Sequence, residues 1–156
     1  GYEIIASTGK ETQNKYLKSL GVSQIINRSE LSKQHKPLDQ QKWVAAIDTV
    51  GSKTLANICA TTKSGGAIAA CGMAQGMDLT TTVAPFILRG ITLYGINSVD
   101  VPMGKRIVAW NRLSTELDNS KFEFISKCYK LSEVTNIAQK ILRGEITGRC
   151  VVDVNS

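Results

Sequence analysis

Two apolar runs in the middle of the chain dominate its hydrophobic pattern. Residues 43–51 and 64–72 are short enough to be strands, and each ends in a polar or glycine turn. An unbroken apolar run suits a strand that is buried on both faces, as in a parallel sheet covered by helices. Residues 52–63 between the runs are long enough for three turns of helix, so the pattern predicts a strand–helix–strand unit.

The pattern also predicts elements along the rest of the chain. Strands are expected at residues 3–6, 22–27, 91–96, 124–131 and 148–154, and helices at 11–20, 85–89, 102–117 and 132–142. Residues 28–42 predict a surface connection with one helical turn, and residues 75–82 predict a loop. Strands that alternate with helices predict an α/β fold.

Length and composition are those of an ordinary globular domain. The chain has 156 residues, of which 42% are apolar and 21% charged. No apolar run approaches the roughly 20 residues that span a bilayer, and no signal peptide opens the chain, so we expect no membrane partner. The chain begins with Gly1 close to a predicted strand, which leads us to expect a piece of a longer protein.

The net charge of +6 is weak evidence about partners. Such a charge attracts nucleic acid or an anionic ligand. The basic residues are dispersed, however, without the run or the interleaved aromatic residues that build a single-strand groove. We therefore expect no nucleic-acid partner.

The sequence offers no metal site. Its four cysteines are scattered and its single histidine, His35, lies in a polar segment, whereas a zinc site needs clustered ligands. Isolated cysteines in apolar runs are expected to be small buried hydrophobic residues, and His35 is expected to be a surface residue rather than a catalyst. Unpaired thiols fit a reducing cytoplasm.

The turn at residues 7–10 follows the first predicted strand. Ser7 and Thr8 supply hydroxyls, Gly9 an accessible backbone and Lys10 a cation, with no carboxylate before Glu11. Hydroxyls, backbone N–H groups and lysine all bind phosphate, and a basic residue at this point of a dinucleotide-binding fold accommodates the 2′-phosphate of NADP. The alternative is a solvated turn in which Ser7 or Thr8 caps the next helix.

Three further turns follow predicted strands. In such sheets ligands bind beyond the carboxyl ends of the strands. The turn of residues 48–51 would line a cofactor groove, although Asp48 or Thr49 could simply cap the next helix. Residues 71–74 and 95–98 bring glycines, and Asn97 could bond a carboxamide; the alternative is that both are ordinary turns.

Phosphate-binding loops are absent from the sequence. It contains no G-x-G-x-x-G, A-x-x-G-x-x-G or G-x-x-x-x-G-K-[ST] pattern. Gly65 and Gly66 precede a predicted strand instead of opening a helix, so we expect them to form a turn.

The order of these segments resembles the medium-chain dehydrogenase/reductase superfamily, and within it the zinc-free quinone oxidoreductase branch that includes NADPH-dependent acrylyl-CoA reductases. The residues that carry the resemblance are Tyr16 to Val22, Trp43 to Gly51, Gly66 to Gly72, Thr81 to Gly90, Gly95 to Val99 and Ile146 to Arg149, with the closing strand. The stretch from Pro85 to Arg89 is the most specific to this branch.

This resemblance implies the portion of an oxidoreductase that binds NADPH and transfers its hydride to an activated double bond, in an enoyl thioester such as acrylyl-CoA or in a quinone. It implies a partial Rossmann domain at residues 1–118, a doubly wound parallel sheet without its first strand and glycine-rich loop. Residues 119–156 would return to an absent GroES-like catalytic domain. That missing N-terminal portion of the same protein is an expected partner, and a homodimer is another.

Site residues also follow from the resemblance. It assigns Ser7, Thr8 and Lys10 to the 2′-phosphate, Thr49 and Val50 to the groove, Cys71, Gly72 and Met73 to the nicotinamide side, Asn97 and Ser98 to a cofactor or substrate edge, and Arg149 to the cofactor's surroundings. No catalytic base is assigned, because the cofactor's hydride does most of the chemistry. Without a phosphate loop, the isolated chain is expected to be inactive. A different hypothesis is a noncatalytic Rossmann-like module whose free sheet edge binds a partner.

Overall fold

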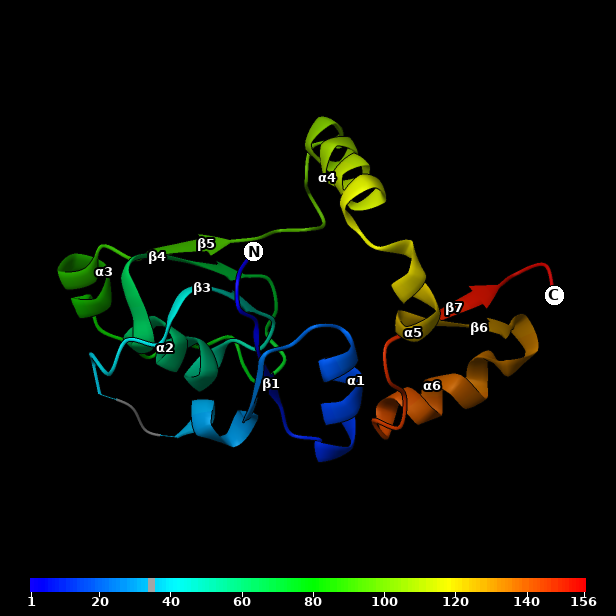
Figure 1. Cartoon of the computed structure of the whole chain (residues 1–156), viewed down its shortest axis with the longest axis horizontal. Helices are drawn as coiled ribbons and strands as arrows, with labels where there is room; N and C mark the ends of the chain where they lie inside the picture. The colour runs from blue at the N-terminus through cyan, green and yellow to red at the C-terminus, as the bar shows by residue number, and fades with distance from the viewer. Residues whose placement is uncertain (34–35) are drawn as a thin grey trace. The chain divides into compact units, whose positions relative to one another are not determined.

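Strands and helices alternate along the computed structural model, which describes residues 1–33 and 36–156 (Figure 1). The strands are β1 (Ile5–Thr8), β2 (Gln24–Asn27), β3 (Trp43–Asp48), β4 (Thr62–Ala70), β5 (Thr92–Gly95), β6 (Ser126–Lys130) and β7 (Arg149–Asp153). The α-helices are α1 (Asn14–Ser19), α2 (Ser52–Thr61), α3 (Ala84–Arg89), α4 (Met103–Glu116), α5 (Phe122–Ile125) and α6 (Val134–Leu142). The expected α/β class is confirmed. His35 lies outside the described residues.

Internal contacts divide the chain into two units. The central unit is Ile26–Arg106, and the terminal unit joins Gly1–Ile25 with Ile107–Ser156. This grouping does not test whether residues 119–156 return to a catalytic domain, so the division after residue 118 stays a prediction.

The central unit holds a parallel sheet in the order β3-β4-β5. Its register places Asp48 beside Ala70 and Ala70 beside Gly95, so the carboxyl ends of the three strands lie together. Helix α2 follows β3 and covers one face of the sheet with a core of Leu55, Ile58, Cys59, Ile68 and Ile91. The predicted strand–helix–strand unit is confirmed.

The opposite face of this sheet is open. Ile47 is 80% exposed and its neighbour two strands away in register, Tyr94, is 55% exposed. The expectation that the run 43–51 is buried on both faces is therefore wrong for this face, because no described segment covers these side chains. An apolar run indicates a strand, but what covers it is decided by the packing around it.

Gly65 and Gly66 lie inside β4, so the expectation of a turn ahead of the strand is wrong. Register explains the difference: Trp43 pairs with Thr62 and Ala45 with Ala67, which leaves four residues of β4 opposite one residue of β3. The glycines therefore form an irregular bulge within the strand. A Cβ on Gly66 would lie 2.6 Å from the Val44 carbonyl oxygen, so only glycine allows this close approach.

Other predicted boundaries shift by a few residues. Strand β1 extends to Thr8, two residues into the expected turn, and Gln13 ends a 3-10 turn before α1 begins. Phe124 and Ile125, expected in a strand, belong to α5, because the apolar run gives no period by which to distinguish a helical turn from a strand.

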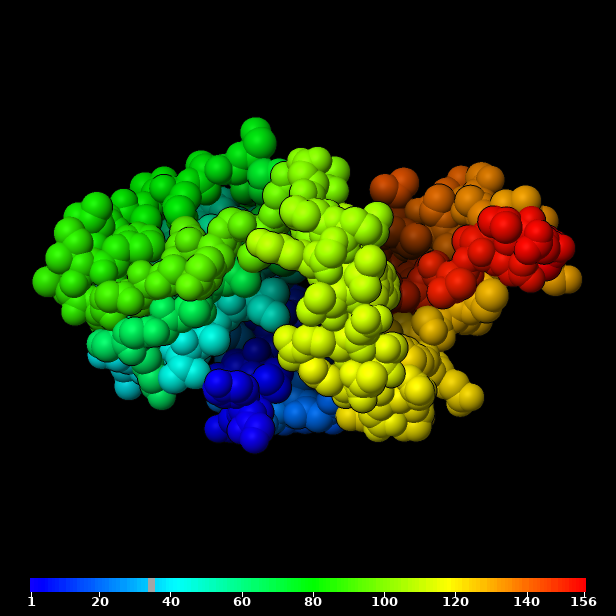
Figure 2. Space-filling view, turned by 90° about the horizontal axis from the view of Figure 1, so that it is seen from above, coloured from blue at the N-terminus to red at the C-terminus, as the bar shows by residue number. Residues whose placement is uncertain are grey.

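The terminal unit pairs β6 with β7 in parallel and carries α6, whose Ile137 is buried. Helix α4 has no buried residue among those described, and its Trp110 is 64% exposed. In the space-filling view α4, in yellow-green, lies at the surface (Figure 2). None of the helices in the described ranges is both long and apolar enough to cross a membrane.

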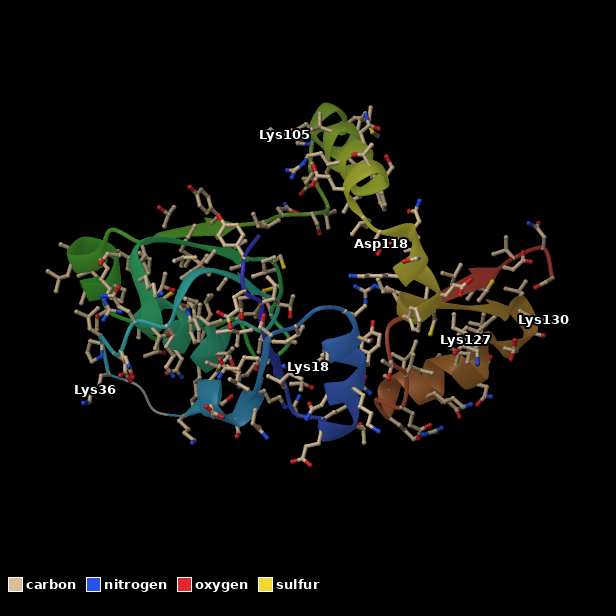
Figure 3. The ribbon with its side chains drawn as sticks, viewed as in Figure 1. Lys18, Lys36, Lys105, Asp118, Lys127 and Lys130 are labelled. Atoms are coloured by element: carbon tan, nitrogen blue, oxygen red, sulfur yellow. The ribbon has the colours of Figure 1, made fainter. Side chains whose placement is uncertain are left out.

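Basic side chains are spread over different elements, as the sequence indicates. Lys18, Lys105 and Lys127, labelled in Figure 3, lie on α1, α4 and β6.

Candidate functional site

An open pocket of about 600 Å³ lies at the carboxyl ends of β3, β4 and β5. Its walls belong entirely to the central unit. They comprise Gly51, Ser52, Leu55, Ala70, Cys71, Gly72, Met73, Gly76, Met77, Asp78, Leu79, Gly95, Ile96, Asn97, Ser98 and Val99. Five predicted site residues are thus brought together from two turns, and the volume is that of an ordinary small-molecule site.

The turn after β3 is held by a buried carboxylate. Asp48 is 2% exposed, and its Oδ2 accepts a hydrogen bond from the Gly51 backbone N–H at 2.8 Å. Gly51 has φ +73°, and a Cβ there would lie 2.6 Å from the Gly76 carbonyl oxygen. A residue without a side chain is therefore required at this wall of the pocket.

Thr49 and Val50 bond the loop that closes the pocket. The Val50 carbonyl accepts from the Gln75 N–H at 2.8 Å, and the Thr49 carbonyl accepts from the Ala74 N–H at 3.5 Å. Neither residue is among those that line the pocket. Their predicted contact with a cofactor stays a prediction, and what the structure adds is their role in supporting the loop of residues 71–79.

Gln75 caps α2, a function that the sequence alternative gave to Asp48 or Thr49. Its Oε1 accepts from the Thr54 N–H at 3.1 Å and from the Thr54 hydroxyl at 3.0 Å. Gln75 lies far from α2 in the sequence, so a local capping pattern cannot reveal it. Nearby, the Ser52 hydroxyl donates to Asp78 at 3.0 Å and anchors the far side of the loop.

The cysteines differ in their surroundings. Cys59 in α2 is fully buried, and burial, with a smaller contribution from the Asp48 carboxylate, raises the pKa of its thiol to about 11. Cys71 and Cys128 are exposed and Cys150 is half-buried, so the expectation that all four are buried hydrophobic residues is wrong. Cys71 follows the end of β4, and Cys128 and Cys150 lie within β6 and β7, where their side chains are not covered as Cys59 is in the α2 core.

Asn97 organises the turn after β5. Its Nδ2 donates to Asp100 at 2.7 Å, and its Oδ1 accepts from the Val99 N–H at 3.1 Å. Arg106 donates to the Ser98 carbonyl at 2.9 Å and holds the same turn from α4. Because an amide has a second N–H, Asn97 keeps one donor for a ligand in the pocket.

The residues predicted for the 2′-phosphate lie in the terminal unit. The Thr8 hydroxyl oxygen accepts a hydrogen bond from the Lys10 N–H at 3.1 Å, and the Thr8 O–H stays available as a donor. Neither Ser7 nor Thr8 caps α1. The Lys10 ammonium donates to the Gly144 carbonyl. Ser7 and Arg149 are exposed, and Arg149 is the first residue of β7.

The pocket walls combine backbone at glycine positions with small and apolar side chains. Gly51 and Gly95 place backbone without side chains in the pocket wall after β3 and at the end of β5. Leu55 and Ala70 supply apolar surface. Its polar side chains are few: Ser52, Asp78, Asn97, Ser98 and the thiol of Cys71. Across residues 1–33 and 36–156, no group of three or more His, Cys, Asp and Glu side chains is placed to hold a metal ion.

Sequence reasoning missed the closing loop. Met77, Asp78 and Leu79 line the pocket, although the sequence predicts only a loop at residues 75–82. The available signal is position, because a segment directly after a strand's carboxyl end in a parallel sheet is placed to border the ligand site.

Comparisons with known proteins give matches over most of the chain. A family model described as zinc-binding dehydrogenase matches residues 1–114. The "Probable acrylyl-CoA reductase AcuI" of Escherichia coli K12 is 45% identical over 155 residues, which are 99% of this chain and 48% of that protein. The chain thus spans about half the length of the curated relatives it matches.

Solved structures agree with this similarity. E. coli K-12 YhdH with bound NADPH is 45% identical with a TM-score of 0.93, over 99% of this chain and 47% of that one. Bacillus subtilis YhfP with bound NAD is 38% identical with the same TM-score of 0.93 and the same coverage, 99% and 47%.

Proposed function

Because the chain belongs to the zinc-binding dehydrogenase family, we propose that it is the NADPH-binding portion of an oxidoreductase. The full protein would transfer the hydride of NADPH to an activated double bond in an enoyl thioester such as acrylyl-CoA, or in a quinone. The observation that carries this proposal is the similarity, over 99% of the chain, to a structure that holds NADPH. The resemblance to medium-chain dehydrogenases/reductases is thereby confirmed.

The pocket supports a role in holding the reactive end of the cofactor. Nicotinamide is flat and carries a carboxamide, and the turn residues Cys71 and Asn97 offer a thiol and an amide at one pocket. NADPH would supply the hydride, while these residues would orient the ring. The enoyl thioester is the favoured acceptor because the similar E. coli protein is named as an acrylyl-CoA reductase.

The proposal extends to the organisation of the protein. We include a homodimer, the missing N-terminal portion as the source of the phosphate loop and catalytic domain, and a cytoplasmic location, which the four free cysteines favour. An isolated chain would bind NADPH weakly and would not turn over, since the pyrophosphate would lack its glycine-rich loop.

Cofactor titration of the full-length protein tests the function. We expect NADPH to bind at least about tenfold more tightly than NADH, a difference of about 1.4 kcal/mol, and Lys10→Ala to narrow that ratio. Lys18→Ala is the matched control, because Lys18 is also an exposed lysine of the terminal unit that donates to a backbone carbonyl. Equal affinity of the unmodified protein for both cofactors would contradict the proposed preference. This outcome is a real alternative because the YhfP structure holds NAD.

A further inference from the structure

We propose that the loop between α6 and β7, residues 144–148, is a positioning element for Lys10 and thereby sets the preference for a 2′-phosphate. This inference rests on the proposed function, because it takes Lys10 as the cation that meets that phosphate. Sequence reasoning gave the loop no part in cofactor choice apart from Arg149 beyond its end.

Two side-chain contacts join this loop to the turn after β1. The Lys10 ammonium donates to the Gly144 carbonyl, and the Gln13 amide donates to the Thr147 hydroxyl at 2.7 Å. All four residues belong to the terminal unit, although more than 130 positions separate them in sequence. The loop thus contacts Lys10, just before the 3-10 turn of residues 11–13, and Gln13, the last residue of that turn.

The contact with Gly144 orients the lysine without neutralising it. An ammonium has three N–H groups, so one bond to a carbonyl leaves the other two for phosphate oxygens. The nearest loop carboxylate, Glu145, accepts a hydrogen bond from Arg143 at 2.6 Å, and this bond keeps the pKa of Glu145 below its ordinary value. The acidic side chain of the loop is thus paired with its own arginine, and Lys10 meets a carbonyl dipole.

The absence of a side chain at position 144 makes this contact possible. Gly144 has φ +68°, and a Cβ there would lie 2.7 Å from Lys10 Nζ and 3.4 Å from Lys10 Cε. Adding a methyl group would therefore displace the ammonium. A specificity device of this kind acts on NADPH alone, because NADH has no 2′-phosphate for the lysine to meet.

Fluorescence titration of the full-length protein with NADPH and with NADH tests the inference. Gly144→Ala is expected to weaken NADPH binding about tenfold and to leave NADH binding unchanged. Gly90→Ala is the matched control, since Gly90 also has a positive φ, +58°, but nothing within 4 Å of its Cβ position. That control should change neither affinity.

A double-variant comparison distinguishes action through Lys10 from general damage. In a Lys10→Ala background, Gly144→Ala should have no further effect on NADPH binding. Equal weakening of both cofactors, or an undiminished effect in the Lys10→Ala background, would overturn the inference. So would unchanged NADPH binding in Gly144→Ala.

A second pair of variants covers the case in which Gly144→Ala fails to fold. Thr147→Val removes the hydroxyl that Gln13 meets, and should weaken NADPH selectively by about threefold, whereas Thr147→Ser should restore wild-type affinity. Equal loss of both cofactors in Thr147→Val would count against the loop. Failure of the proposed function itself is seen separately, in an unmodified protein that binds neither dinucleotide or does not prefer NADPH.

Discussion

Single residues at the strand ends decide how closely the backbone of this protein can approach itself and a ligand. Gly51 has a positive φ, and the Gly76 carbonyl oxygen lies where a Cβ would be. The Gly51 N–H donates a hydrogen bond to the Asp48 carboxylate. Position, more than residue type, gives these groups their roles. The same residue types occur elsewhere in the chain without such contacts.

The first prediction concerns Gly51. Gly51→Ala in the full-length protein should lower the free energy of unfolding by about 1–3 kcal/mol, because alanine is strained at this φ and its methyl group would meet the Gly76 carbonyl. Chemical denaturation measures the change. Gly95→Ala is the control, since nothing lies within 4 Å of its Cβ position, and an equal loss in both variants would contradict the prediction.

The second prediction follows from the Cys59 thiol, whose pKa is raised from 9.0 to about 11, chiefly by burial. The folded state keeps the proton more tightly than the unfolded state, so this stabilisation is complete below pH 9 and is lost as the pH rises towards 11. The loss should reach about 3 kcal/mol. Denaturation of the full-length protein across this range, compared with Cys59→Ala, isolates the effect; parallel profiles would exclude it.

Among the secondary-structure elements, α2 depends on side chains that come from outside it. Gln75 caps its beginning, and Arg89 donates to the Ala60 carbonyl at its end at 2.8 Å. The same guanidinium reaches the Thr62 carbonyl at 3.1 Å and the Asp39 carbonyl at 2.5 Å. These contacts fix α2 against the sheet and thereby fix the wall of the pocket that α2 provides.

The third prediction tests these contacts of Arg89, which we call the Arg89 clamp. Arg89→Lys should lower the free energy of unfolding by about 1–3 kcal/mol, because an ammonium cannot reproduce the fork that reaches three carbonyls. Thermal and chemical denaturation of the full-length protein measure the change. Arg112→Lys is the control, as its ion pair with Glu116 is exposed on α4, and it should leave stability unchanged. Unchanged stability of Arg89→Lys, with or without a loss in Arg112→Lys, would refute the Arg89 clamp.

At the scale of the whole molecule, one face and one edge of β3 are left uncovered by the described residues. Ile47 is 80% exposed. Its strand, β3, is an edge strand of the three-stranded sheet and pairs only with β4. In a doubly wound sheet the first strand is central and helices cover both faces. The N-terminal portion that we propose for the full protein would therefore place β3 inside the sheet.

The fourth prediction uses the exposure of Ile47 as a test of this view. Ile47→Lys in the full-length protein should lower the free energy of unfolding by about 3 kcal/mol or more, because a lysine would be buried without a partner. Val154→Lys is the control, at a residue that is 67% exposed near the C-terminus. If the midpoints of both variants equal that of the wild type, β3 is exposed in the full protein as well.

The sequence by itself determined the fold class, the order of the elements and the strand–helix–strand unit around β3 and β4. Apolar periodicity and turn residues such as Gly90 are local properties, and secondary structure follows largely from local properties. The sequence also placed Cys71 and Asn97 at strand ends, because parallel strands bring their carboxyl ends to one edge.

Only the tertiary structure decided which distant groups meet. The cap from Gln75 on α2, the bulge at Gly65 and Gly66, and the contact between Lys10 and Gly144 all join segments whose approach depends on register and packing. Burial likewise separates Cys59 from Cys71, since one faces the α2 core and the other the pocket. A chain's own pattern specifies its elements, whereas contacts across the fold depend on how those elements pack together in space.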